Sequence, residues 1–290
     1  MATSVSSHDL VQAHIELDGA PEEALQILSL EGRESISRLF EFQISAASTQ
    51  GLNAEAMLGL NAALVFRRGE EETRRLFGMI SAVHDAIDTE TQHSTYRLVF
   101  VPRAFRMTLH ETLDIFMDLT VPEIVEKKLQ LAGLAKDVDY QLRLLETYPK
   151  REFVVQYRES DLAFISRITE HLGLSFFFDH TDGRDVFVLT DHNGGFLPVS
   201  EEGSFDFRRR GDRRDVYKLE STARLIPSEY IVRDYNYRTP QLELGARADV
   251  DGAGGRVVEY GAHFKTNEEA ARIAKLRSEE ALAAQRVLDG

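Results

Sequence analysis

Hydrophobic residues between positions 148 and 180 change their spacing twice, which predicts a strand, a helix and a second strand in close succession. Phe153, Val155 and Tyr157 alternate with the residues between them, as expected for a strand. Four aliphatic residues then recur at helical spacing, namely Leu162, Ile165, Ile168 and Leu172. Ser160 stands at the N-cap position of this helix, and Gly173 stands where the helix would end.

The residues after this helix predict a buried strand followed by a tight hairpin. Residues 174–178 are too few and too aromatic for a helix, so we expect a strand that is covered on both faces. Asp182 and Gly183 form a turn signal that leads into a further strand over residues 185–190. Four aromatic residues of the whole segment are expected in the core: Phe153, Tyr157, Phe164 and Phe176.

The N-terminal part of the chain is rich in alternating patterns that predict β-strands. Residues 62–66 and 76–83 flank the charged stretch RRGEEETRR, which we interpret as an exposed hairpin loop. A further strand is predicted from the alternation of Tyr96, Leu98 and Phe100. Thr120 and Glu123 then form a capping-box pattern, and the helix that they begin would end at Gly133.

Strand patterns return in the last third of the chain. The polar stretch over residues 191–203 indicates a boundary, and strand-like runs follow at residues 216–226 and 230–237. Within the second run, Tyr235 and Tyr237 are expected to pack inside a β-barrel rather than to form a shelf for a ligand. The GAGG sequence that comes next is typical of a loop.

The chain ends in a predicted helix with a narrow apolar stripe. Thr266 and Glu269 form a second capping-box pattern. The stripe is suited to docking on one partner surface and consists of Ile273, Leu276, Ala281 and Ala284. Together these elements predict an α+β, mainly β protein with three modules: strands over residues 1–110, an α/β module over residues 111–200, and strands with the terminal helix over residues 201–290.

Composition narrows the classes of function. The chain has 290 residues and a net charge of −14, which argues against binding to nucleic acid or to an anionic membrane. It has no cysteine, so disulfides, thiolate catalysis and cysteine-ligated zinc are all excluded. The first residues have neither a basic nor an apolar region of the kind found in secretory signal peptides, and no apolar run is long enough to span a bilayer.

The motifs of common enzyme and metal sites are missing from the sequence. There is no G-x-S-x-G nucleophile motif and no phosphate-binding P-loop. His110 and Glu111 resemble half of a zinc-binding H-E-x-x-H helix, but the second histidine is replaced by Asp114, so we expect a surface turn. Acidic and histidine residues over 179–192 lack a recognised ligand spacing, and residues 249–255 do not fit a calcium-binding loop. We therefore expect no catalytic residue, metal or cofactor.

Charged residues give the candidates for a protein interface. The sequence RRRGDRR is the densest basic cluster of an acidic chain, and it suggests contact with an acidic partner or a neighbouring subunit, or a solvated loop. The final helix carries further charged candidates. The candidate interface residues are Arg208, Arg209, Arg210, Arg213, Arg214, Arg272, Lys275 and Glu279. Charge reversal of Arg208, Arg209 and Arg210 is expected to weaken assembly without unfolding the monomer.

Several of these segments together resemble the VgrG family, the trimeric spike proteins of type VI secretion systems. The most specific is QYRESDLAFISRITEHLGLSFFF, which closely resembles the signature of that family. Six further segments resemble segments of the family and occur in the same order: RLFEFQI, LFGMISAV, YRLVFVPRAFRMTL, TVPEIVEKKL, VLTD and YNYRTP. The terminal helix is also similar. The resemblance extends over essentially the whole chain, and the N-terminal half of VgrG in turn resembles the baseplate hub of contractile phage tails.

The resemblance implies a fold and a set of partners. Two related antiparallel β-barrel modules, similar to tube proteins, would flank an α/β insertion, and the C-terminal helix would lead into an oligonucleotide/oligosaccharide-binding-type barrel and a β-helical needle. Three chains would form a six-barrel ring that matches a hexameric tube. The implied partners are the tube protein, baseplate components, and effectors or their adaptors. Nucleic acid is not implied, and a target membrane would be met only through the needle. The protein would assemble in the cytoplasm and leave through the type VI apparatus.

Other functions remain open at this point. The chain also fits the hub of a phage tail, a tailocin or an extracellular contractile injection system. An enzyme such as a cell-wall or glycan hydrolase would need a pair of acidic residues, and no such pair is readable in the sequence. A soluble ligand-binding β module is the remaining alternative.

Overall fold

The computed structural model describes residues 11–21, 24–48, 51–86, 94–198 and 218–289. They divide into two compact units. Unit 1 comprises Met1–Glu170 and Leu174–Leu197, and unit 2 comprises His171–Gly173 and Pro198–Gly290. β-strands outnumber helices in both units, which confirms the prediction of a mainly β protein.

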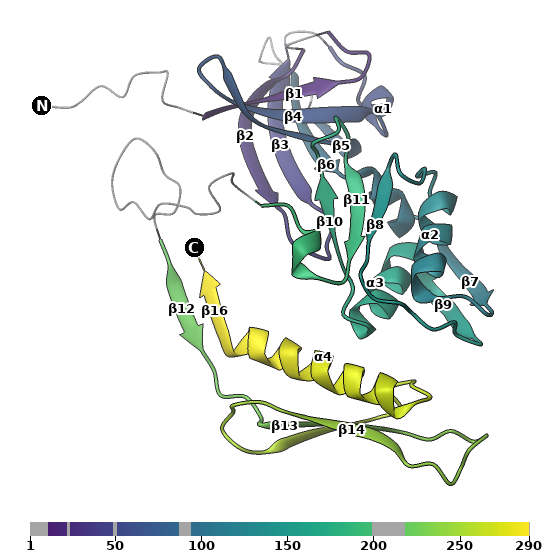
Figure 1. The fold of residues 1–290 in the computed structure, drawn as a ribbon. Helices are drawn as coiled ribbons and strands as arrows, with labels where there is room; N and C mark the ends of the chain where they lie inside the picture. The colour runs from purple at the N-terminus through teal and green to yellow at the C-terminus, as the bar shows by residue number, and fades with distance from the viewer. Residues whose placement is uncertain (1–10, 22–23, 49–50, 87–93, 199–217, 290) are drawn as a thin grey trace, which may run out of the picture. The chain divides into compact units, whose positions relative to one another are not determined.

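The first part of unit 1 is a six-stranded antiparallel sheet in the order β1-β4-β5-β6-β3-β2 (Figure 1). Its strands are β1 (Val11–Leu17), β2 (Gln26–Arg33), β3 (Glu41–Ser48), β4 (Asn61–Arg68), β5 (Glu71–Ala86) and β6 (Ser94–Val101). The edge strands β1 and β2 approach each other, but no pairing between them occurs among the described residues. The sheet is therefore an incomplete barrel, and a closed first barrel is not present in this part of the chain.

Alternating side chains fill the concave side of this sheet. Ile44, Leu64, Ile80 and Leu98 are each fully buried, as the period of two predicts. The predicted hairpin between β4 and β5 is confirmed, although the strands extend into the charged stretch and leave only Gly69 and Glu70 as its turn. The short helix α1 (Ala54–Met57) and the 3₁₀ helix η2 (Arg103–Thr108) flank the sheet.

The second part of unit 1 is an α/β segment. Its elements are β7 (Glu111–Phe116), α2 (Val121–Leu131), β8 (Tyr140–Arg143), β9 (Val154–Ser160), α3 (Asp161–His171), β10 (Ser175–Asp179), β11 (Val186–Thr190) and the 3₁₀ turn η3 (Asn193–Gly195). β10, β11 and β8 form one sheet, in which β8 runs parallel to β11. β7 and β9 form a separate antiparallel pair, and the two helices lie beside it (Figure 1).

The helix caps and the hairpin predicted for this segment are confirmed. The capping box of α2 is complete, since Thr120 accepts from the Glu123 main-chain N–H and Glu123 accepts from that of Thr120. The Ser160 hydroxyl accepts from the Ala163 N–H at the start of α3, and Gly173 follows the helix with a φ of 71°. The predicted hairpin of β10 and β11 is confirmed by its antiparallel register.

Two predictions about this segment were wrong. Phe153 and Tyr157 were expected in the core, and they are 61% and 66% exposed, whereas Phe164 and Phe176 are buried. The reason is that alternation identifies two faces of a strand without saying which face is covered. Residues 110–114 were expected to form a surface turn, and Glu111 instead begins strand β7, whose residues pair with residues of β9 that lie 38 to 49 positions further along the chain.

Unit 2 is small. The central strand of its sheet, β13 (Glu229–Asp234), pairs with β14 (Leu244–Asp249) in antiparallel orientation and with β15 (Arg256–Tyr260) in parallel orientation. A separate antiparallel pair is formed by β12 (Glu220–Ala223) and β16 (Arg286–Asp289). The parallel pair departs from the expected antiparallel barrel, and no closed second barrel is present among the described residues. Helix α4 (Asn267–Gln285) packs on this sheet.

The core of unit 2 lies under the first half of α4. Ile273 is buried there with Val232 and Phe264, whereas Ala284, at the far end of the predicted apolar stripe, is exposed. The second capping box is half formed: Thr266 accepts from the Glu269 N–H, but the Glu269 carboxylate accepts from Lys265. Tyr235 and Tyr237 are 59% and 72% exposed, so the expectation that they pack inside a barrel was wrong.

Candidate functional site

The β7–β9 pair combines an unusual inner face with an unusual outer face. Its register is fixed by pairs that include Asp114 opposite Gln156 and Leu113 opposite Tyr157. Successive residues of a strand point to opposite faces, so Asp114 and Gln156 lie on one face together with Phe116, and Leu113, Ile115 and Tyr157 lie on the other. The polar face is the inner one, because Gln156 is fully buried and Asp114 pairs with helix α2 through Lys128.

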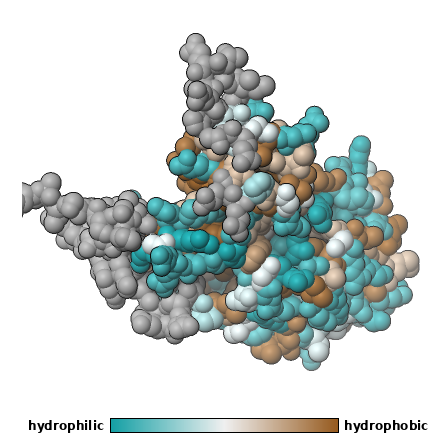
Figure 2. Space-filling model, turned by 90° about the horizontal axis from the view of Figure 1, so that it is seen from above, coloured by the Kyte–Doolittle hydropathy of each residue, from teal (hydrophilic) through white to brown (hydrophobic). Residues whose placement is uncertain are grey.

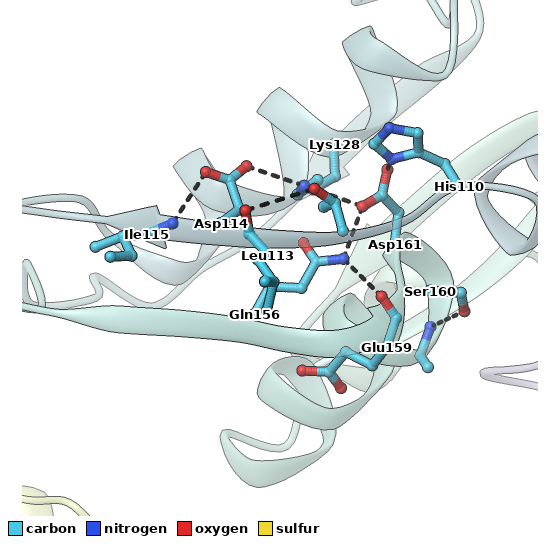
Figure 3. Close-up of polar contacts among 11 residues, drawn as sticks. His110, Leu113, Asp114, Ile115, Lys128, Gln156, Glu159, Ser160 and Asp161 are labelled. Carbon is cyan, nitrogen blue, oxygen red and sulfur yellow. Dashed lines mark hydrogen bonds and ion pairs between the residues drawn. The ribbon is translucent and has the colours of Figure 1, made fainter.

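A buried lysine lies at the centre of the inner face (Figure 3). Lys128 is fully buried, and its Nζ atom lies 2.9 Å from Asp161 Oδ1 and 3.2 Å from Asp114 Oδ2. The ammonium also lies 5.3 Å from the centre of the Phe116 ring, which is within range of a cation–π interaction. Phe116 in turn stacks on Phe164 of α3, at 5.5 Å between ring centres. One cation thus ties α2 to both strand β7 and helix α3.

Asp161 is the most connected carboxylate of this cluster. Gln156 Nε2 donates to its Oδ1 at 2.9 Å, and His110 Nδ1 lies 2.9 Å from its Oδ2 (Figure 3). Burial disfavours the charged carboxylate, but the hydrogen bonds from Gln156 and Lys128 outweigh it and lower the pKa of Asp161. The carboxylate therefore stays ionised and paired at neutral pH. Lys128 and Asp161 are 0% and 2% exposed, so the ion pair between them acts as a structural clamp, and only Asp114 and His110 at its margin reach solvent.

The outer face of the same two strands is apolar. Leu113 and Ile115 of β7 are 64% and 60% exposed, and Met117 just beyond the strand is 65% exposed. Phe153 and Tyr157 continue this surface from the β9 side. Hydrophobic side chains also appear among hydrophilic ones elsewhere on the surface, as Figure 2 shows for one face of the molecule. Here they occupy consecutive positions of one face of a strand pair, which makes a contiguous patch.

Sequence reasoning missed the buried cluster, although a signal was present. Lys128 stands four residues after Ile124 and three after Val125, so it lies on the apolar face of the predicted helix α2. A lysine in that position requires an internal carboxylate. Nothing in the sequence identified Asp161 and Asp114 as its partners, because strand β7 was not recognised.

The acidic residues of 179–192 are separated by the structure into different pairs. Asp185 accepts from the main-chain N–H and the side chain of Arg103, Asp179 pairs with Arg143 at 2.9 Å, and Asp191 accepts from the N–H groups of residues 145 and 146. Asp179, Asp185 and Asp191 thus each have a structural partner of their own. Among the described residues, no three acidic or histidine side chains gather in a way that would hold a metal ion.

A further titratable group in this region is the half-buried His180. Its Nδ1 atom accepts a hydrogen bond from the Phe77 N–H of strand β5 at 3.1 Å, which requires the unprotonated form of that nitrogen. Burial, with a smaller effect from Arg74, lowers the pKa of His180 to about 4. This histidine therefore joins the hairpin β10–β11 to the six-stranded sheet in its neutral state.

The described residues include the predicted interface residues of α4. The basic cluster with Arg208, Arg209, Arg210, Arg213 and Arg214 lies outside the described residues. On α4, Lys275 and Glu279 are exposed and lie 3.7 Å apart as an ion pair, and Arg272 is half-buried. None of the described helices combines the length and hydropathy needed to cross a bilayer.

Comparison with known proteins matches this chain to hub proteins of contractile tails. A family model described as phage tail baseplate hub (GPD) matches residues 33–290. The actin cross-linking toxin VgrG1 of Vibrio cholerae is 29% identical over 238 residues, which cover 78% of this chain and 21% of the toxin. The type VI secretion system spike protein VgrG4b of Pseudomonas aeruginosa is 29% identical over 235 residues, which cover 80% and 28% of the two chains.

Solved structures show the same fold. The E. coli c3393 protein, a component of the type VI secretion system, aligns with a TM-score of 0.67 at 22% identity over 94% of this chain and 62% of that one. A tail protein from Neisseria meningitidis aligns with a TM-score of 0.66 at 11% identity over 96% and 79%. The resemblance to VgrG is thereby confirmed, while this chain spans less than a third of the length of the two curated relatives named above. Because the family model covers residues 33–290, the chain belongs to the phage tail baseplate hub family.

Proposed function

We propose that this chain forms the base of a type VI secretion spike, as a homotrimeric adaptor between the hexameric tube and the membrane-puncturing needle. The observation that carries the proposal is the match to the hub family over residues 33–290, together with relatives that are spike proteins of the VgrG type. In this proposal each chain contributes two barrel-type modules, and three chains give the six positions that a hexameric ring requires.

The open sheets of the single chain support an assembled state. Among the described residues, the six-stranded sheet of unit 1 leaves β1 and β2 as unpaired edges, and the three-stranded sheet of unit 2 leaves β14 and β15 unpaired on one side each. An unpaired edge strand presents a row of free main-chain N–H and C=O groups that another chain can pair with. We infer that neighbouring subunits or the tube cover part of these edges.

The proposed role is mechanical and involves no catalysis by these residues. Lys128, Asp161 and Arg103 are held in buried or half-buried pairs, which suits a rigid scaffold. The toxin activity in the name of the Vibrio cholerae relative belongs to a protein of which this chain matches 21%. Measurable hydrolysis of peptidoglycan by this chain would contradict the structural role.

The proposed partners include baseplate components and effectors or their adaptors. The protein would assemble in the cytoplasm and be exported by the type VI apparatus. The direct test is co-purification of this chain with a type VI tube protein, followed by measurement of native mass and stoichiometry. Three copies of the chain bound to one hexameric ring is the expected result. Absence of binding to tube protein and baseplate in every oligomeric state would overturn the proposal.

A second candidate is the hub of a phage tail or a related injection machine. The tail protein from Neisseria meningitidis favours it, because its fold matches this chain nearly as well as that of the E. coli protein. Paired binding assays with a type VI tube protein and with a phage tail tube protein separate the two candidates. Preference for the phage protein would assign the chain to the second class.

A further inference from the structure

The register of the β7–β9 pair places apolar side chains together on its outer face. We define the apolar face as Leu113, Ile115, Met117, Phe153, Val155 and Tyr157. Leu113 lies opposite Tyr157 and Ile115 opposite Val155, and the bridge between Leu119 and Arg151 continues the same register past Met117 and Phe153. The six side chains therefore form three cross-strand rows on one surface.

The buried cluster prevents this face from turning inward. A slip of one residue would place the apolar side chains inside, but it would also remove Asp114 and Gln156 from the buried polar network around Lys128 and Asp161. An unpaired buried ammonium costs several kcal/mol, about 3–5 by analogy with other proteins. The apolar side chains thus point outward because the polar ones are fixed inward.

The size of the apolar face matches the centre of a protein interface. Leu113, Ile115, Met117, Phe153 and Tyr157 are each at least 60% exposed. Since a large side chain presents roughly 150–250 Å² when fully exposed, five such residues expose on the order of 600 Å². That area reaches the upper range for the largest patch on a monomer and approaches the roughly 800 Å² that each partner buries in a standard interface.

The edge of the apolar face carries a cation that points to an acidic partner. Arg158 is the extra residue of a β-bulge, since Thr112 pairs with Glu159 and Leu113 with Tyr157. Its φ is 48°, a backbone conformation that residues other than glycine rarely adopt. Arg158 is exposed, and the described residues give it no ion pair. Glu111 stands at the same end, so a charged rim borders the apolar centre, as in protein interfaces.

We propose that the apolar face docks onto a second copy of this chain, with Arg158 directed at an acidic surface of that copy. The chain has 48 acidic against 34 basic residues, so a second copy offers carboxylates in excess to Arg158, and the six residues of the apolar face add no like charge to the contact. This inference rests on the proposed hub function, in which several copies assemble, and it assigns the surface that joins them.

The test is the substitution Ile115→Asp, with Leu131→Asp as its matched control. Ile115 is 60% exposed in the middle of the apolar face, and Leu131 is 68% exposed on α2, away from it. A carboxylate buried at a contact would weaken self-association at least about tenfold, and the same change outside the contact would not. Native mass by light scattering over a concentration range measures association, and thermal unfolding of each variant checks that the fold is retained.

Single cysteines supply an independent readout, because the chain has no cysteine of its own. The thiol of Ile115→Cys is expected to lose reactivity at concentrations where the multimer forms, while that of Leu131→Cys keeps it. Three results would overturn the inference: wild-type protein that stays at one chain mass, an Ile115→Asp variant that associates normally, or protection of Ile115→Cys only after another baseplate protein is added.

Binding of the same samples to tube protein separates this inference from the proposed function. If the wild-type chain binds tube protein and the Ile115→Asp variant self-associates as strongly as wild type, the docking surface alone is refuted. A chain that associates through the apolar face but binds no tube or baseplate protein would refute the hub function alone.

Discussion

Replacement of Lys128 by methionine is the sharpest test of how the α/β segment is held together. Methionine keeps the length and apolar character of the lysine stem, so the change removes the ammonium with little change in packing. The ammonium is fully buried and pairs with Asp161, which is 2% exposed, and with Asp114, which is 40% exposed. Asp114 reaches solvent and loses little, whereas Asp161 is left as a buried carboxylate without its cation.

The expected loss follows from that difference in exposure. Removal of one partner of a buried ion pair typically costs 3–5 kcal/mol. Gln156 and His110 still hydrogen-bond to Asp161, so we expect the lower end, about 3 kcal/mol of unfolding free energy at pH 7. Urea unfolding followed by circular dichroism measures the difference. Lys127→Met is the matched control, since Lys127 is the exposed neighbour on the same helix, and it should change stability by less than about 0.5 kcal/mol.

The pH dependence checks the cause of the loss. In the wild-type protein the pKa of Asp161 is lowered, so its ionised form stabilises the fold above the ordinary aspartate pKa and this stability is lost as pH falls. Without Lys128, burial raises the pKa of the same carboxylate, which can then take up a proton in the folded state. The deficit of Lys128→Met should therefore shrink between pH 7 and pH 4. A deficit that equals that of Lys127→Met, or that stays constant with pH, would refute the reasoning.

Three further predictions concern the scaffold. Burial lowers the pKa of His180 from 6.5 to about 4, so neutral His180 stabilises the fold above pH 6.5, and up to about 3 kcal/mol of unfolding free energy is lost as pH falls towards 4. His180→Asn should reduce this dependence of unfolding free energy on pH, as measured by unfolding curves at pH 7 and 4.5, and an unchanged dependence would contradict the prediction. Gly78→Ala would place a Cβ atom 2.3 Å from a main-chain carbonyl oxygen, so we expect a loss of about 1–3 kcal/mol, whereas Gly51→Ala, which meets nothing within 4 Å, should be nearly neutral in the same assay. Thr120→Ala removes the cap that accepts from the Glu123 N–H and should lower stability by about 1 kcal/mol; equal thermal midpoints for variant and wild type would show that the cap is dispensable.

Local signals in the sequence were sufficient for most individual elements. Thr120 with Glu123 predicted the start of α2, and Gly173 predicted the end of α3, because caps depend on residues within one helical turn. The hairpin at Gly183 was predictable for the same reason. Strand β7 was missed, because its residues alternate over a short distance and its partner β9 is remote in the sequence.

The sequence by itself determined the family, the mainly β composition, the ends of the principal helices and the two alternating faces of residues 153–157. Only the tertiary structure decided which of those faces is covered. Lys128 from α2 and Asp161 from α3 hold Gln156 inward, so Phe153 and Tyr157 face outward. The physical reason is that a period of two is symmetric between the faces of a strand, and the choice between them depends on contacts with elements distant in the chain.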